Sequence, residues 1–156
     1  EENKPLGTIG ALGLAKNDFK KTVFVTNCDT LVYGNYSKMY DFHVENNFDL
    51  TIVGAYKDEE LPYGVCELNS NGELKTFTER PSRDIIINTG MYILNTDLLD
   101  NIPTDKKYDA TDLIKRCQDS NKKIGVFPIS KNRWLDTGEW SKYYDTLERE
   151  QYLKIL

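Results

Sequence analysis

Two runs of β-branched and aromatic residues, at 22–27 and 50–56, enclose a segment with helical periodicity at 35–47. Neither run alternates regularly between polar and apolar residues, which is typical of strands that are buried on both faces. The segment between them carries large side chains at i, i+3, i+4 and i+7, namely Tyr36, Met39, Tyr40 and His43. A strand, a helix and a second strand in this order predict a right-handed βαβ crossover with two parallel strands.

The middle of the chain has a different pattern, in which short strands are separated by turns. Asn69-Ser70-Asn71-Gly72 is a hairpin-type connection, so we expect the strands around it to be antiparallel in part. The predicted elements after residue 56 are strands at 63–69, 73–78, 85–94 and 123–130, and helices at 97–101, at 109–120 and from about 139. We therefore predict an α/β fold with a mixed, mostly parallel sheet flanked by helices, in one domain over residues 1–156.

The composition excludes several classes of protein. Among 156 residues, 25 are acidic and 20 are basic, and the net charge of −5 argues against a nucleic-acid-binding face. No apolar run approaches the roughly 18 residues of a membrane helix. An odd number of widely spaced cysteines fits neither a disulfide framework nor a zinc site, so we expect buried thiols in a reducing, cytoplasmic setting. These cysteines are Cys28, Cys66 and Cys117.

The chain opens on a glycine loop instead of a strand. The loop Gly7-Thr8-Ile9-Gly10 leads directly into a segment with helical propensity. An α/β domain usually begins with a buried strand, so we expect a chain that is truncated at its N-terminus. Two glycines let a backbone approach a ligand closely, and N–H groups at the start of a helix favour anions or base edges. The same pattern fits a tight turn with small-residue packing, and the two interpretations are about equally supported.

Two carboxylates lie beside predicted strands at distant points of the chain. Asp29 follows the strand at 22–27, at the kind of strand end where open α/β sheets bind ligands. Asp136 lies in Trp134-Leu135-Asp136-Thr137-Gly138, between a strand signal and a helix. Mg²⁺ prefers carboxylate oxygens as ligands, so the functional hypothesis is that both aspartates bind one Mg²⁺ ion. Each aspartate taken alone is more typical of a turn or a helix cap.

A third group of polar residues lies in the middle of the chain. Glu79 is a carboxylate that can accept sugar hydroxyls, and Arg80 beside it can hold a phosphate. Asn88 and Thr89 interrupt an apolar run, so they need hydrogen-bond partners in a ligand or in a neighbouring loop. Tyr63-Gly64 is either a plain turn into a strand or a place where a ligand meets bare backbone.

Taken together, these motifs resemble those of the sugar-phosphate nucleotidyltransferase family, the nucleotide-sugar pyrophosphorylases. The resemblance covers nearly the whole chain, and it is strongest to mannose-1-phosphate and hexosamine-phosphate guanylyltransferase-like members. Each motif is short, but six of them occur in the family's order. They are Leu6-Gly7-Thr8-Ile9-Gly10-Ala11-Leu12, Val25-Thr26-Asn27-Cys28-Asp29, Pro62-Tyr63-Gly64-Val65, Glu79-Arg80-Pro81, Asn88-Thr89-Gly90-Met91-Tyr92 and Trp134-Leu135-Asp136-Thr137-Gly138.

The resemblance implies a Rossmann-like nucleotide-diphospho-sugar transferase fold and a reaction with Mg²⁺. In that reaction a sugar 1-phosphate and an NTP, with GTP as one candidate, give an NDP-sugar and pyrophosphate by in-line attack at the α-phosphorus. The resemblance implies that Asp29 and Asp136 hold the metal and that Arg80 joins them in the catalytic set. The implied substrate contacts are Gly7, Thr8 and Gly10 along the nucleotide, and Tyr63, Gly64, Glu79, Asn88 and Thr89 in the sugar pocket.

The chain departs from the family pattern at two points. Arg80 stands where the family usually has a lysine, and the glycine-rich signature that grips the triphosphate would precede residue 1. We therefore expect the chain alone to be inactive, and exposed strand edges would favour a homo-oligomer. Two alternatives stay open. One is a non-catalytic regulatory or nucleotide-sugar-binding relative, and the other is a glycosyltransferase of the same fold, which usually presents Asp-x-Asp where this chain has Asn27-Cys28-Asp29.

Overall fold

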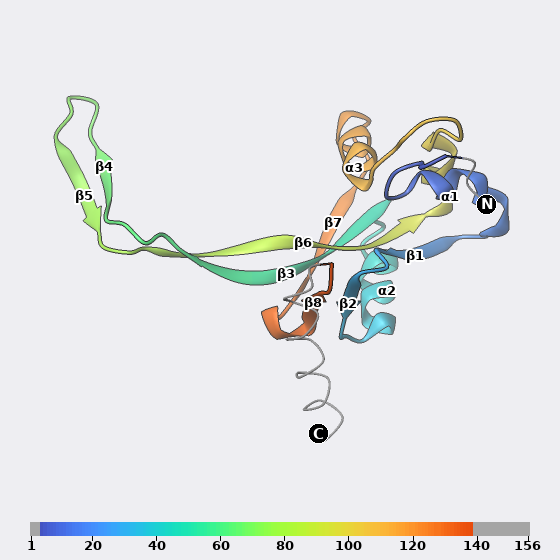
Figure 1. Ribbon diagram of the computed structural model, residues 1–156, viewed down its shortest axis with the longest axis horizontal. Helices are drawn as coiled ribbons and strands as arrows, with labels where there is room; N and C mark the ends of the chain where they lie inside the picture. Colours follow the sequence, from blue (N-terminus) through green and yellow to red (C-terminus); the bar gives the residue numbers. More distant parts are fainter. Residues whose placement is uncertain (1–3, 139–156) are drawn as a thin grey trace, which may run out of the picture.

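The computed structural model describes residues 4–138, and the predicted helix from about residue 139 lies outside them (Figure 1). In chain order the elements are α1 (Gly10–Leu14), η1 (Lys16–Asp18), β1 (Thr22–Thr26), β2 (Thr30–Val32), α2 (Tyr36–Glu45), β3 (Leu50–Glu60), β4 (Val65–Leu68), β5 (Leu74–Thr78), β6 (Ser82–Asn95), η2 (Thr96–Asn101), α3 (Ala110–Asp119), β7 (Ile124–Ile129), η3 (Lys131–Arg133) and β8 (Trp134–Asp136), where η marks a 3₁₀ helix. None of the helices within residues 4–138 is long and apolar enough to cross a membrane.

A four-stranded sheet in the order β1-β6-β3-β7 forms the centre of the molecule. β6 runs antiparallel to both β1 and β3, and β3 runs parallel to β7, so β1, β3 and β7 share one direction. The prediction of a mixed sheet is therefore confirmed, but the sheet is not mostly parallel in its pairing, because β6 makes both of its pairs antiparallel and only β3 and β7 pair in parallel. The two strands of the predicted βαβ unit, β1 and β3, also point the same way, but β6 is inserted between them.

β1 lies at the edge of this sheet, and here the structure differs from the prediction. Val23 is buried, but Phe24 is 39% exposed, because β1 has a neighbouring strand on one side only. The prediction of burial on both faces is thus wrong for β1. It is correct for β3 from Leu50 to Ala55, since β6 and β7 flank that part of the strand.

Apolar side chains on the two faces of the sheet form two separate clusters. On β6, Tyr92 and Leu94 join a cluster with α1, η2 and α3, whereas Met91 and Ile93 join a cluster with β2 and α2. This division follows from the alternation of side chains along a strand. Figure 1 accordingly shows α1 and α3 on one side of the sheet, and α2, β2 and β8 on the other.

The helix α2 buries half of its predicted apolar stripe. Met39 and His43 face the sheet, and the His43 imidazole lies 2.9 Å from the Thr51 hydroxyl. Tyr36 and Tyr40 are 45% and 40% exposed, because β1 at the sheet edge leaves one flank of the helix uncovered. The helix therefore exists where the periodicity predicts it, but it is less buried than expected.

The cysteines differ in their exposure. Cys117 of α3 is buried, whereas Cys28 and Cys66 are exposed, and all three are free thiols. The expectation of buried thiols is thus right for Cys117 and wrong for the other two. Cys28 lies in the turn after the edge strand, and Cys66 lies on a hairpin that packs against no apolar cluster of the described chain.

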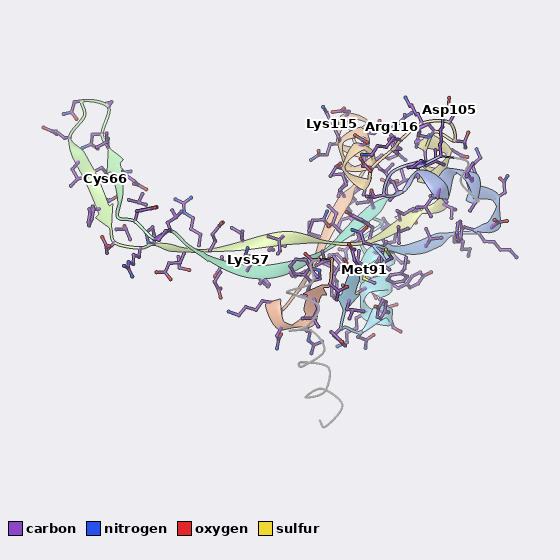
Figure 2. The ribbon with its side chains drawn as sticks, in the orientation of Figure 1. Lys57, Cys66, Met91, Asp105, Lys115 and Arg116 are labelled. Carbon is purple, nitrogen blue, oxygen red and sulfur yellow. The ribbon has the colours of Figure 1, made fainter. Side chains whose placement is uncertain are left out.

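β3 and β6 continue beyond the sheet as a long two-stranded ribbon. We call residues 56–87, which include this ribbon and the β4–β5 hairpin at its end, the arm. Figures 1 and 2 show the arm extending away from the rest of the molecule, with Lys57 on the ribbon and Cys66 on the hairpin. The predicted turn is confirmed, since the Gly72 N–H donates to the Asn69 carbonyl at 3.0 Å and Gly72 has a φ of 86°.

Candidate functional site

Asp29 and Asp136 lie side by side, although 106 residues separate them in the chain. β2 pairs antiparallel with β8, and this register places Thr30 opposite Asp136. One residue further along, the Thr137 N–H and hydroxyl both donate to the Asp29 carbonyl, at 2.8 Å and 3.0 Å. The short β2–β8 ladder therefore joins the turn after β1 to the end of β8.

Gly138 gives a measure of how close the two carboxylates are. A Cβ atom built on Gly138 would lie 2.9 Å from Oδ2 of Asp29 and 3.3 Å from Oδ1 of Asp136. The two oxygens are thus at most about 6 Å apart, and one Mg²⁺ with ligands at about 2.1 Å spans up to about 4 Å between two oxygens. Both carboxylates therefore border the same small space around Gly138, where Asp29 is exposed and Asp136 is partly buried.

The two carboxylates fit the requirements of a magnesium site that also uses substrate oxygens. The Gly138 N–H donates to Oδ1 of Asp136 at 3.1 Å, which orients that carboxylate towards the Asp29 turn. Within residues 4–138 there is no cluster of three or more acidic, histidine or cysteine side chains that would complete a protein-only site. The remaining ligands of an ion held by Asp29 and Asp136 would therefore be phosphate oxygens or water.

Gly90 brings the Asn88-Thr89-Gly90 motif to the same edge of the sheet. The Asn27 N–H donates to the Gly90 carbonyl at 3.1 Å, and a Cβ on Gly90 would lie 2.7 Å from the Asn27 amide nitrogen. With a φ of 82°, this position suits glycine on both counts. Asn88 is exposed nearby, where its amide donates to the Tyr92 hydroxyl at 2.8 Å and accepts from the Gly90 N–H at 3.0 Å.

Thr89 has a place in the sheet instead of in a pocket. Its side chain is buried, and its hydroxyl donates to the Val53 carbonyl at 2.8 Å and accepts from the Met91 N–H at 3.3 Å. These bonds span the irregularity where the β3–β6 register shifts between Val53 and Gly54. We therefore leave the Thr89 side chain out of the sugar site that the resemblance implies.

The loop with Gly7, Thr8 and Gly10 packs against the start of α3. The Thr8 N–H donates to Oδ1 of Asp109 at 2.9 Å, and the Ala110 N–H donates to the Thr8 hydroxyl at 2.9 Å. The hydrogen bond from Thr8, with a further contribution from Lys107, lowers the pKa of Asp109 below its usual value. Gly7 has a φ of 85° and no room for a Cβ against Asp109, so the tight-turn interpretation describes this loop.

The residue after Thr8 and the strand after Asp29 contribute to different apolar clusters. Ile9, which follows Thr8, belongs to the apolar cluster on the α1 and α3 face, whereas Val32 of β2 belongs to the cluster on the opposite face. The close contacts of Gly7, Thr8 and Gly10 are with Leu6, with the start of α3 and with the segment before it, and contact of these three residues with a nucleotide stays a prediction. The Thr8 backbone N–H and hydroxyl that a nucleotide would use are engaged by α3.

The residues of the implied sugar pocket on the arm form a separate group. A Cβ on Gly64 would lie 3.0 Å from Oε2 of Glu79, so these two residues face each other at the base of the β4–β5 hairpin. Arg80 has a φ of 45°, and its Nε lies 3.9 Å from Oε1 of Glu79. Tyr63 is 75% exposed. The arm holds this group away from the Asp29–Asp136 edge in the structure (Figure 1).

A cavity of about 250 Å³ at the start of α2 was not anticipated from the sequence. Its lining includes two basic side chains, those of Lys38 and Arg133, and two large apolar side chains, those of Met39 and Phe127. Arg133 directly precedes β8, so the cavity lies at the other end of the β2–β8 ladder from Asp136. Its lining comes from two chain segments, 34–39 and 127–133, that are far apart in the sequence, and no local motif marks such a combination.

The chain is similar in sequence to known proteins. A family model described as nucleotidyl transferase matches residues 1–151. The chain is 36% identical over 106 residues to the mannose-1-phosphate guanylyltransferase catalytic subunit beta of Drosophila melanogaster, covering 65% of this chain and 29% of that protein. It is 31% identical over 148 residues to a mannose-1-phosphate guanyltransferase of Debaryomyces hansenii, covering 88% of this chain and 40% of that protein.

The fold is similar to that of a solved bacterial protein. HddC from Yersinia pseudotuberculosis matches with a TM-score of 0.67 and 28% identity, covering 95% of this chain and 64% of that one. A second structure of HddC, complexed with GMP-PN, matches with the same TM-score and 25% identity. The chain thus spans less than half the length of the two curated relatives and about two thirds of HddC.

Proposed function

Because this chain belongs to the nucleotidyl transferase family, we propose that its protein transfers a nucleotidyl group from an NTP to a sugar 1-phosphate. The products are an NDP-sugar and pyrophosphate. The observation that carries the proposal is the convergence of Asp29 and Asp136 around Gly138. The names of the two guanylyltransferase relatives favour GTP as the nucleotide and mannose 1-phosphate as the sugar phosphate.

The proposed reaction is a direct displacement between two bound anions. A phosphate oxygen of the sugar 1-phosphate attacks the α-phosphorus of the NTP and forms a new P–O bond. The bond from the α-phosphorus to the bridging oxygen of the β-phosphate breaks, and pyrophosphate leaves with that oxygen and its electron pair. No protein nucleophile takes part, so catalysis depends on holding the two phosphates in line.

Asp29 and Asp136 are the residues that would hold Mg²⁺. Bound there, the ion neutralises phosphate charge and orients phosphate oxygens. Thr137 fixes the backbone of Asp29 with two hydrogen bonds, and Gly138 leaves room for both carboxylates. The chain's own contribution is therefore a pair of acidic ligands whose spacing is set by the β2–β8 ladder.

Contacts with the sugar form a separable part of the proposal. Asn88 and Asn27 both hydrogen-bond with Gly90, next to the turn that contains Asp29, whereas Glu79 and Arg80 lie on the arm. A substrate that touched both groups would require the arm to approach the sheet edge. Arg80 and Glu79 are both exposed, so neither is committed to the core of the described part of the chain.

Metal binding to this chain tests the carboxylate pair directly. Mn²⁺, which substitutes for Mg²⁺ in oxygen sites and has an electron paramagnetic resonance signal, is titrated into the chain and into the Asp29→Asn and Asp136→Asn variants. Each variant is expected to weaken Mn²⁺ binding at least about tenfold. Asp105→Asn is the matched control, because Asp105 is an exposed aspartate remote from β2 and β8 (Figure 2).

The activity itself is measured on the intact gene product. Pyrophosphate release is followed with Mg²⁺, GTP and mannose 1-phosphate, and UTP and glucose 1-phosphate serve as alternative substrates. Release is expected to fall at least about a hundredfold in both asparagine variants, because loss of one metal ligand disturbs both phosphates. If the two variants bind Mn²⁺ and release pyrophosphate like the unmodified protein, the carboxylate pair is not the metal site and the proposal is wrong.

A further inference from the structure

The β4–β5 hairpin at the end of the arm has one apolar and one polar face. Cross-strand partners share a face of a hairpin, and the pairs on one face are Cys66 with Phe77 and Leu68 with Leu74. On the other face Glu67 pairs with Thr76, and Lys75 lies 3.7 Å from Glu67. The register shift between Glu67 and Leu68 lets Leu74 share a face with Phe77, so one face of the hairpin is apolar and the other is mostly polar, with Val65 as its apolar member.

No core covers the apolar face within the described part of the chain. Leu68, Leu74 and Phe77 are 63%, 58% and 57% exposed, and Cys66 is exposed as well. Figure 2 shows the hairpin far from the sheet and its helices, so the described body of the molecule does not shield it. An isolated two-stranded hairpin is only marginally stable in water, and packing of its apolar face against another element is what stabilises such a hairpin.

We propose that the apolar face of the β4–β5 hairpin packs against the same face of a second copy of this chain, about a two-fold axis. A self-complementary interface of this kind must avoid opposing like charges. The four side chains of the face carry no charged group, and the charged residues of the hairpin strands, Glu67 and Lys75, lie 3.7 Å from each other. The Glu79 carboxylate lies beside the Phe77 ring at the base of the hairpin, where Arg80 is 3.9 Å from it. The arm's projection from the body also lets two hairpins meet without a clash between the two sheets.

The exposed area is consistent with a weak, reversible dimer. The four apolar side chains leave on the order of 250 Å² open on each copy, so a pair would bury about 500 Å² of apolar surface. Apolar atoms make up somewhat more than half of a typical interface, which gives a total of about 900 Å². Interfaces of that size belong to transient complexes, so we expect a dissociation constant in the micromolar range, on the order of 10 µM.

Sedimentation equilibrium of the full 156-residue chain, from about 1 to about 200 µM, tests this proposal. The chain is expected to pass from monomer to dimer, and Leu74→Lys is expected to weaken dimerisation at least about tenfold by placing two like charges in the interface. Thr76→Lys, a neighbouring substitution on the polar face opposite Glu67, is the matched control and is expected to dimerise normally. A mixture of Leu74→Lys and Leu74→Glu is expected to recover the dimer.

Alkylation of the exposed thiols gives a second readout in the unmodified chain. Dimerisation is expected to slow the alkylation of Cys66 at high protein concentration, whereas Cys28, at the other exposed site, keeps its rate. Circular dichroism of Leu74→Lys at low concentration confirms that the variant is folded. The proposal is overturned if the chain stays monomeric throughout, or if Leu74→Lys dimerises as tightly as the unmodified chain.

Discussion

Replacing Thr89 with valine tests whether this residue serves the sheet or a ligand. Valine has nearly the same shape but removes the hydroxyl, so the Val53 carbonyl loses its donor at 2.8 Å and the Met91 N–H loses its acceptor at 3.3 Å. Thr89 is only 2% exposed, so water cannot replace these bonds at low cost. Two buried hydrogen bonds of this kind contribute about 2–3 kcal/mol to the free energy of unfolding.

The assay is urea denaturation, with thermal melting as a second measurement. For a chain of this size a loss of about 2–3 kcal/mol lowers the melting temperature by about 6–10 °C. Thr89→Ser is the matched control, because it keeps the hydroxyl and removes one methyl group, which costs about 1 kcal/mol. If Thr89→Val is as stable as the unmodified chain, the reasoning that these two hydrogen bonds stabilise the sheet is refuted.

Two further predictions concern groups whose pKa the fold shifts. Burial raises the pKa of Asp49, but hydrogen bonds from the Lys123 N–H and the Lys122 ammonium outweigh it, so the pKa lies below its usual value. The stability that this carboxylate contributes is therefore present above about pH 4 and is lost as the pH falls through the lowered pKa. Asp49→Asn should cost about 1–2 kcal/mol in urea denaturation at pH 7 and much less at about pH 3; an equal cost at both pH values would contradict this. Burial likewise raises the pKa of the Cys117 thiol, so Ellman's reagent should label two thiols of the folded chain and three only after unfolding.

Local features of this protein could be predicted from the sequence because they depend on neighbouring residues. The periodicity at 35–47 and 109–120 identified α2 and α3, and the latter begins at a capping box formed by Asp109 and Asp112. Asn69-Ser70-Asn71-Gly72 identified the turn of the hairpin, because glycine readily adopts the positive φ that Gly72 has there. In each case the signal lies within about ten residues of the element that it predicts.

The positions and contacts of the polar motifs in the folded protein were less predictable. Glycine spacing in Gly7-Thr8-Ile9-Gly10 fits a ligand loop and a packed turn equally well, and only the tertiary structure shows that the loop packs against Asp109. Thr89 interrupts an apolar run in either interpretation, and only the register shift in β3 shows that its hydroxyl is needed inside the sheet. Both outcomes depend on residues more than thirty positions away in the chain.

The sequence by itself indicated the longer helices and strands and the hairpin turn, and that Asp29 and Asp136 are carboxylates beside strands, but it did not indicate β2. Only the tertiary structure decided that β1 lies at the edge, that β6 separates it from β3, and that the arm leaves the sheet. It also decided that the two carboxylates meet, through the pairing of β2 with β8. The physical reason is that periodicity reports which face of an element is apolar, whereas the choice of partner depends on how all such faces pack together.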